Sequence, residues 1–237
     1  MKTMKAIKLI ILFCLLSATI FAQVSGFLGK KNIISANLFM KSSFVMPNKN
    51  GENGYFSFND HYSLEYERVI NRKNSIKFHV TSFESMYNLF GNSISIYDNI
   101  NTFSTKGFGA DFVIYRRNHI APLGAYISVG FDVFMSNVNY DTAAIRSLYP
   151  FDLNLTNKNS ANTIHFGGNF KSGIKQIFFK CISLDINFHM GLMAADYDKD
   201  SYSFNINEID SYIGKQVGVR LWGHYLWGVN CSVGYVF

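Results

Sequence analysis

Ionisable side chains recur at alternate positions along several segments of this 237-residue chain. The set is Glu65, Glu67, Lys77, His79, Asp111, Asp132, His165, Lys171, Asp185 and His189. Carboxylates and imidazoles on one face could serve as acid–base groups or metal ligands. Inside a small β-barrel, the same groups could instead form a hydrogen-bonded, ion-paired network that fills the lumen. The mixture of acids, lysines and histidines favours the network, because buried charges must be paired.

The catalytic interpretation lacks a recognisable motif. None of the three histidines in this set has the spacing of a metal-binding motif. A hydrolase needs a serine and a histidine in hydrogen-bond contact, oriented by a third group. His189 with Ser183, or His224 with Ser232, would be candidates, but neither pair lies in such a motif. We therefore predict no catalytic residue, no metal ligand and no cofactor.

The elements that carry these side chains have the period of a β-strand. Eight segments alternate apolar with polar residues, and glycines, serines and asparagines dominate the polar positions. The segments are residues 32–44, 61–69, 75–81, 106–115, 123–135, 163–174, 182–192 and 224–237. Short connections alternate with long ones, and the long ones are residues 45–57, 85–105, 137–162 and 194–223. This rhythm is typical of a transmembrane up-and-down barrel with short turns at one end and long loops at the other.

One stretch departs from the strand period. Between Glu208 and Trp222, apolar residues follow helical spacing, although two glycines weaken the pattern. We expect a short amphipathic helix in the last long loop. A ninth strand there is the alternative, and it would make the strand count odd.

The N-terminal residues have the layout of a secretory signal peptide. Lys2, Lys5 and Lys8 precede a short apolar run, and small residues lead to Ala22. We therefore predict a cleaved peptide at residues 1–22 and a barrel domain at residues 23–237. The formal charge of +6 includes these three lysines, and the remaining charges are scattered, so the sequence gives no indication of nucleic-acid binding. Aromatic residues make up 16% of the chain and charged residues only 16%, yet no later apolar run is long enough for a membrane helix.

The last segment, "NCSVGYVF", alternates to its final residue and places Val233, Tyr235 and Phe237 on one face. It resembles the C-terminal assembly signal of Gram-negative outer-membrane β-barrels. With eight alternating segments, the chain is similar to the small OmpA/OmpX type. The resemblance implies a bacterial outer-membrane location, insertion by the barrel-assembly machinery, and outer-membrane lipid as partner. We also expect a monomer with Tyr225 and Trp227 as interfacial aromatics.

The expected function follows from this architecture. We predict a structural or surface-interaction protein whose long extracellular loops could bind an extracellular ligand or protein. A lipid A-modifying enzyme of the outer membrane is the first alternative. A small-solute pore is the second, and it is disfavoured because side chains fill the interior of an eight-stranded barrel.

Overall fold

A computed structural model describes residues 26–42, 58–88, 100–116, 120–139, 160–194 and 209–237. The predicted signal peptide at residues 1–22 lies outside the described residues. So do residues 43–57, 89–99, 140–159 and 195–208, which hold most of the predicted loops. The strands are β1 (Asn32–Ser42), β2 (Phe58–Val69), β3 (Asn74–Asn88), β4 (Ile100–Tyr115), β5 (Gly124–Asn139), β6 (Ser160–Phe178), β7 (Ile182–Ala194) and β8 (Trp227–Val236).

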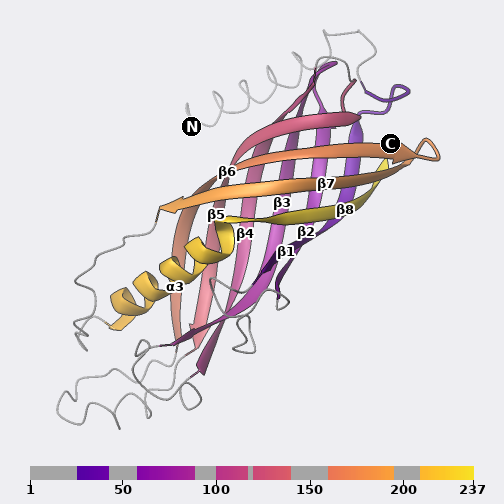
Figure 1. Cartoon of the computed structure of the whole chain (residues 1–237). Helices are drawn as coiled ribbons and strands as arrows, with labels where there is room; N and C mark the ends of the chain where they lie inside the picture. The colour runs from indigo at the N-terminus through magenta and orange to yellow at the C-terminus, as the bar shows by residue number, and fades with distance from the viewer. Residues whose placement is uncertain (1–25, 43–57, 89–99, 117–119, 140–159, 195–208) are drawn as a thin grey trace, which may run out of the picture.

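The eight strands form a closed barrel in which each strand pairs with its neighbours in the sequence. Every pair is antiparallel, and β1 closes the ring against β8 from Ile33↔Val236 to Met40↔Val229. Figure 1 shows this barrel. We call the end at which the four long connections attach the loop end. The opposite end, where the β2–β3, β4–β5 and β6–β7 connections and Phe237 lie, is the turn end. The predicted eight-stranded antiparallel up-and-down barrel is confirmed.

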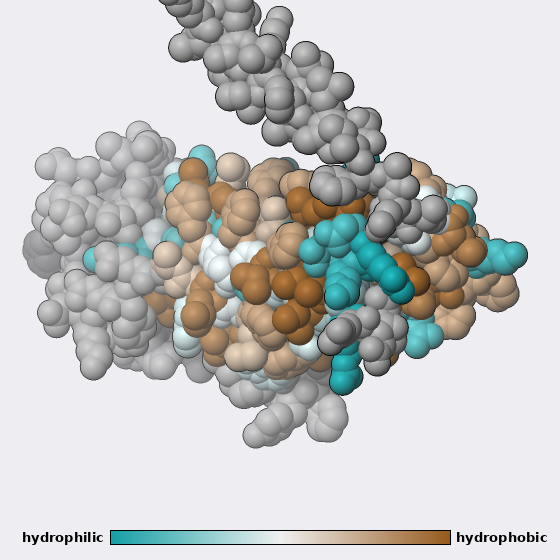
Figure 2. All heavy atoms as spheres, turned by 90° about the horizontal axis from the view of Figure 1, so that it is seen from above, coloured by the Kyte–Doolittle hydropathy of each residue, from teal (hydrophilic) through white to brown (hydrophobic). Residues whose placement is uncertain are grey.

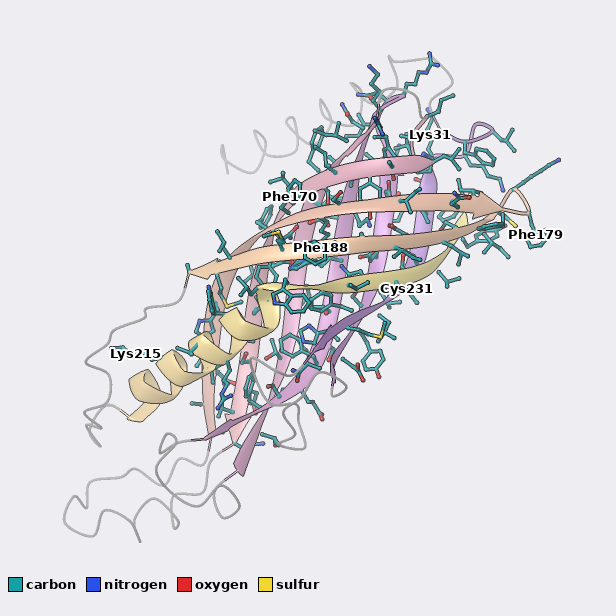
Figure 3. All side chains as sticks on the ribbon, in the orientation of Figure 1. Lys31, Phe170, Phe179, Phe188, Lys215 and Cys231 are labelled. Carbon is teal, nitrogen blue, oxygen red and sulfur yellow. The ribbon has the colours of Figure 1, made fainter. Side chains whose placement is uncertain are left out.

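The barrel is apolar outside and polar inside. Strand β7 shows the pattern over its whole length, because every second residue from Ser183 to Met193 is buried. The intervening residues face outward, and Leu192 is 70% exposed. Figure 3 labels Phe170 and Phe188 on β6 and β7, and both side chains are exposed on the outside. Figure 2 shows hydrophobic surface over the middle of the barrel and hydrophilic residues toward its turn end.

Several strands extend beyond the predicted segments. Strand β6 has 19 residues, and β3 and β4 remain paired as far as Asn88↔Ile100. Parts of the predicted connections 85–105 and 137–162 therefore belong to the sheet. The extension follows from backbone pairing, since an antiparallel ladder can continue past the apolar belt wherever both partners stay extended.

Side chains and backbone geometry fix the turns. Asn71 Oδ1 accepts hydrogen bonds from the backbone N–H groups of Lys73 and Asn74, both at 2.9 Å, which closes the β2–β3 turn. In the β6–β7 turn, Phe179 and Lys180 have φ angles of 49° and 63°. The N–H of Cys181 donates to the carbonyl of Phe178 at 3.1 Å, so the two positive angles lie at the centre of a type I′ turn.

The helical spacing near the C-terminus corresponds to α3 (Ile209–Tyr225), which confirms the predicted helix. The helix continues three residues beyond Trp222, and its contacts are with β7, β6 and β3 at the loop end (Figure 1). Val217 and Leu221 are buried in that contact. Across the described ranges, no helix is both long and apolar enough to cross a membrane.

Candidate functional site: the polar lumen

The strand alternation directs the predicted ionisable set into the lumen. Nine of its ten members are buried, namely Glu65, Glu67, Lys77, His79, Asp111, Asp132, Lys171, Asp185 and His189. His165 faces the same side of β6 but is only half-buried, and its Nε2 has no hydrogen-bond partner among the described residues. The lumen therefore gathers charges from β2, β3, β4, β5, β6 and β7 into one interior.

Glu67 is the centre of the network nearest the turn end. Its carboxylate accepts hydrogen bonds from Ser75 Oγ at 2.5 Å and Tyr115 OH at 2.7 Å. Lys175 donates to the same carboxylate and forms an ion pair with it. The ammonium of Lys175 also lies 3.6 Å from a carboxylate oxygen of Asp185. A buried carboxylate with three donors has most of its acceptor capacity satisfied.

Lys77 connects two further carboxylates. Its Nζ lies 3.2 Å from Glu65 Oε2 and 3.4 Å from Asp185 Oδ2. Asn37 donates to the other oxygen of Glu65 at 3.1 Å. The hydroxyl of Tyr126 donates to Asp185, with oxygen–oxygen distances of 2.8 and 2.9 Å. One lysine thus bridges acids from β2 and β7 across the interior.

The third group is built around His79. Its Nε2 lies 2.5 Å from Asp132 Oδ1, and its Nδ1 lies 3.7 Å from Asp111 Oδ2. Lys171 forms an ion pair with Asp111 at 2.7 Å, and Asn169 donates to Asp132 at 2.7 Å. Each carboxylate thus has a cationic or donor partner, which buried charges require.

Lys175 is a member of this network that the sequence analysis missed. It was predicted to lie in a connection, residues 175–181, but it belongs to β6 and pairs with Gly124 of β5. The sequence did indicate an inward position for Lys175, because Asn169, Lys171 and Lys175 continue one alternation along β6. The predicted set also lacked the uncharged donors of the network, which include Ser75, Tyr115 and Tyr126.

Tyr225 corrects one prediction. It was expected among the interfacial aromatics, but its side chain is buried in the lumen and donates to the carboxylate of Asp132. The reason is that α3 ends at Tyr225, so this residue is outside the alternation of β8. Trp227, the other expected interfacial aromatic, begins β8 and stacks on Phe188, with ring centroids 6.5 Å apart.

Six rings form an aromatic layer on the loop-end side of the charges, made by Phe39, His61, Phe83, Phe134, His189 and Tyr225. His61 stacks on Phe83 with 3.8 Å between centroids, and Tyr225 meets His189 edge-on at 4.8 Å. At the turn end, an apolar cluster of Val69, Val113, Tyr115, Ala121 and Tyr126 forms the floor of the lumen. The phenylalanines were not predicted, because they lie on strand faces whose other residues are polar.

A small cavity lies between the charges and the aromatic layer. Its volume is about 50 Å³, and His61, His79, Lys171 and Asn230 contribute to its lining. Small-molecule sites have volumes of roughly 300–1,000 Å³, so this cavity cannot hold a typical substrate. Within the described residues, no cluster of His, Cys, Asp or Glu could hold a metal ion. Among the described residues, this part of the lumen is packed and has room for only a few water-sized molecules.

The position of Tyr225 depends on a groove in β6 and β7. A β-carbon at Gly191 would overlap the Tyr225 ring and its backbone carbonyl, and one at Gly167 would also meet the ring. We expect Gly191→Ala to lower the free energy of unfolding by about 1–3 kcal/mol through overpacking. Urea titration of the refolded barrel in lipid vesicles would measure it.

The control is Gly168→Ala, because its β-carbon would lie on the outer face in open space, 3.9 Å from the Gly130 carbonyl oxygen. This control should change stability by less than about 0.5 kcal/mol. The cost of Gly191→Ala should also be smaller in a Tyr225→Ala background than in the natural chain. An equal cost in both backgrounds would show that the ring does not determine it.

The residues of the expected C-terminal assembly signal lie on the outside of β8. Val233, Tyr235 and Phe237 are all exposed, and the rings of the last two stack with centroids 6.2 Å apart. The backbone of Phe237 also belongs to the barrel seam, because it exchanges hydrogen bonds of 2.9 and 3.0 Å with Asn32.

The closed ring of eight antiparallel strands, with an apolar outside and a polar, filled inside, defines the class of this protein. It has the fold of the small eight-stranded transmembrane β-barrels. No family model matches the chain, and no curated protein matches it in sequence.

Solved structures of three bacterial barrels are similar to this chain. The N-terminal β-barrel domain of Pseudomonas aeruginosa OprF is 8% identical, with a TM-score of 0.38, and the match covers 88% of this chain and 98% of that one. Ail, the attachment invasion locus protein of Yersinia pestis, solved with the heparin analogue sucrose octasulfate, is 9% identical with a TM-score of 0.40, over 88% and 97% of the two chains. Neisserial surface protein A is 10% identical with a TM-score of 0.41, over 87% and 95%.

Proposed function

We propose that this chain is a bacterial outer-membrane barrel that serves as a structural anchor for surface loops. The observation that carries the proposal is the inverted distribution of polarity. Large apolar side chains are exposed over the outside of every strand, whereas lysines, acids and histidines are buried inside. In water this arrangement would expose a continuous apolar surface. In a bilayer the outside meets lipid, and closure pairs the backbone groups of the edge strands.

We place the interaction with a partner at the loop end of the barrel. The strand ends that flank residues 43–57, 89–99, 140–159 and 195–208 all lie there, so these four segments are attached to the barrel at one end. Loops on a rigid scaffold are common sites of recognition. An extracellular ligand or protein is the proposed partner. Insertion by the barrel-assembly machinery and a monomeric state complete the proposal.

The alternatives find less support in the described residues. A pore needs a continuous channel, whereas an apolar floor, ion pairs and an aromatic layer occupy this lumen. A lipid A-modifying hydrolase needs a serine beside a histidine. Ser183 and His189 are six positions apart on β7, which corresponds to roughly 20 Å along an extended strand.

Membrane fractionation and heat-dependent gel migration test the barrel. The protein should fractionate with the outer membrane and migrate differently before and after boiling, and recovery as a soluble periplasmic protein would contradict the proposal. A deletion strain should lose binding to a surface ligand while its lipid A mass spectrum is unchanged. A changed lipid A profile would favour the enzyme, and swelling of protein-containing liposomes in small sugars would favour the pore.

A further inference from the structure

The turn end of the barrel carries a collar of cations. Its members are Lys31, Arg68, Arg72, Lys73, Arg116 and Lys180. They come from the start of β1, the end of β2, the β2–β3 turn, the end of β4 and the β6–β7 turn, so they surround the barrel rather than cluster on one strand. In the described residues around these turns, no exposed Asp or Glu side chain accompanies them.

The collar cations are not neutralised by neighbouring acids. None of the six forms an ion pair with a carboxylate of the described residues, whereas the lysines of the lumen all do. Their backbone is nevertheless held firmly. The carbonyl of Arg72 accepts from Ala121 N at 2.9 Å, and that of Lys73 accepts from Tyr115 N at 2.7 Å. These bonds join the β2–β3 turn to the end of β4 and to the β4–β5 connection, so the charges are presented from a fixed platform.

Exposed apolar side chains accompany the charges. Phe179 is 86% exposed at the tip of the β6–β7 turn, directly before Lys180 (Figure 3). Ile70 precedes the turn that carries Arg72 and Lys73, and Leu28 and Ile120 are also exposed at this end. A surface that alternates cations with apolar side chains matches the boundary between lipid headgroups and acyl chains.

In the part of the chain that the structure describes, the opposite end of the outer surface lacks this bias. Toward the loop end, the exposed outer side chains include the acids Asp60 and Glu84 as well as Lys106. Among the described residues, the excess of positive charge is therefore found at the turn end.

We propose that this collar binds the phosphate headgroups of anionic phospholipids in the leaflet at the turn end. Arginine forks and lysine ammonium groups are the side chains that bind phosphate oxygens, and an anionic leaflet attracts cations close to its surface. The apolar tips favour lipid over a polymer in the aqueous phase, since only a lipid offers acyl chains beside the phosphate. This inference rests on the proposed function in one respect, namely that the barrel spans a membrane.

The test uses the full chain refolded in detergent micelles and titrated with phosphatidylglycerol or phosphatidylcholine under native mass spectrometry. The wild-type protein should retain phosphatidylglycerol more tightly than phosphatidylcholine, and added salt should weaken the preference. The variant Arg72→Gln with Lys73→Gln should lower the apparent phosphatidylglycerol affinity about 25-fold, because each of the two cations near an anionic surface contributes about a fivefold factor.

Two controls make the result specific. Lys106→Gln with Lys215→Gln removes the same charge toward the loop end and should leave the phosphatidylglycerol affinity unchanged. Arg72→Lys with Lys73→Arg keeps the charge and should retain most of the affinity. Equal affinities of the wild-type protein and the Gln variant would overturn the collar proposal, as would collar-dependent sedimentation with peptidoglycan sacculi without any lipid preference.

Heat-dependent gel migration separates this inference from the proposed function. If the wild-type chain folds into a heat-modifiable barrel but has no preference for phosphatidylglycerol, only the collar proposal fails. If the chain does not fold into such a barrel in any lipid or detergent, the proposed function fails and the collar proposal fails with it.

Discussion

Replacing Lys77 with methionine is expected to lower the free energy of unfolding by about 3–5 kcal/mol, the usual cost of breaking a buried ion pair from one side. Methionine fills much of the same volume but removes the cation between Glu65 and Asp185. Asp185 keeps Tyr126 and Lys175 as partners, whereas the paired oxygen of Glu65 loses its cation. Urea titration of the barrel in lipid vesicles measures the loss.

Two further variants show whether charge is the cause. Lys106→Met removes an exposed lysine from β4, outside the collar, and should change stability by less than about 0.5 kcal/mol. Adding Glu65→Gln to Lys77→Met should recover much of the loss, because the unpaired carboxylate becomes a neutral amide. If Lys77→Met unfolds at the same urea concentration as the natural chain, the lumen charges do not determine stability.

The lumen illustrates what a single sequence can and cannot specify. Alternation assigns Lys77 and Asp185 to the inside because a strand places successive side chains on opposite faces. It does not pair them, since they are 108 positions apart and meet only when the barrel closes. The same holds for Glu67 and Lys175, which come from β2 and β6. Whether a side chain faces the interior thus follows from its own strand, whereas its partner is determined only when the whole barrel closes.

The sequence pattern also fails to place Tyr225 and Phe83 in the lumen. Tyr225 shares a face with Trp227 only if one strand continues through both, and the change from helix to strand breaks that parity. Phe83 lies at an inward position of β3 but is apolar, so a rule that sends apolar residues to the lipid misplaces it. It is buried because His61 stacks on it, a contact that depends on the register between β2 and β3.

Deletion of the C-terminal residue is expected to have the second large effect, because this residue has two separable roles. Deleting Phe237 should reduce the amount of barrel at the cell surface and also weaken the barrel itself. Its N–H donates to Asn32 O at 2.9 Å, and its carbonyl accepts from Asn32 N at 3.0 Å and Lys31 N at 3.2 Å. Losing these three hydrogen bonds at the β1–β8 seam should cost about 1.5–4.5 kcal/mol.

Phe237→Ala separates the ring from the backbone, because it keeps the seam hydrogen bonds and removes only the side chain that stacks on Tyr235. If the ring is read by the assembly machinery, this variant should be depleted from the outer membrane in cells yet refold in detergent with a stability near that of the natural chain. Phe170→Ala removes a similarly exposed outer ring from β6 and should leave surface levels unchanged. Normal surface levels of Phe237→Ala, with depletion confined to the deletion, would mean that the terminal residue acts through barrel closure and that its ring is not a signal.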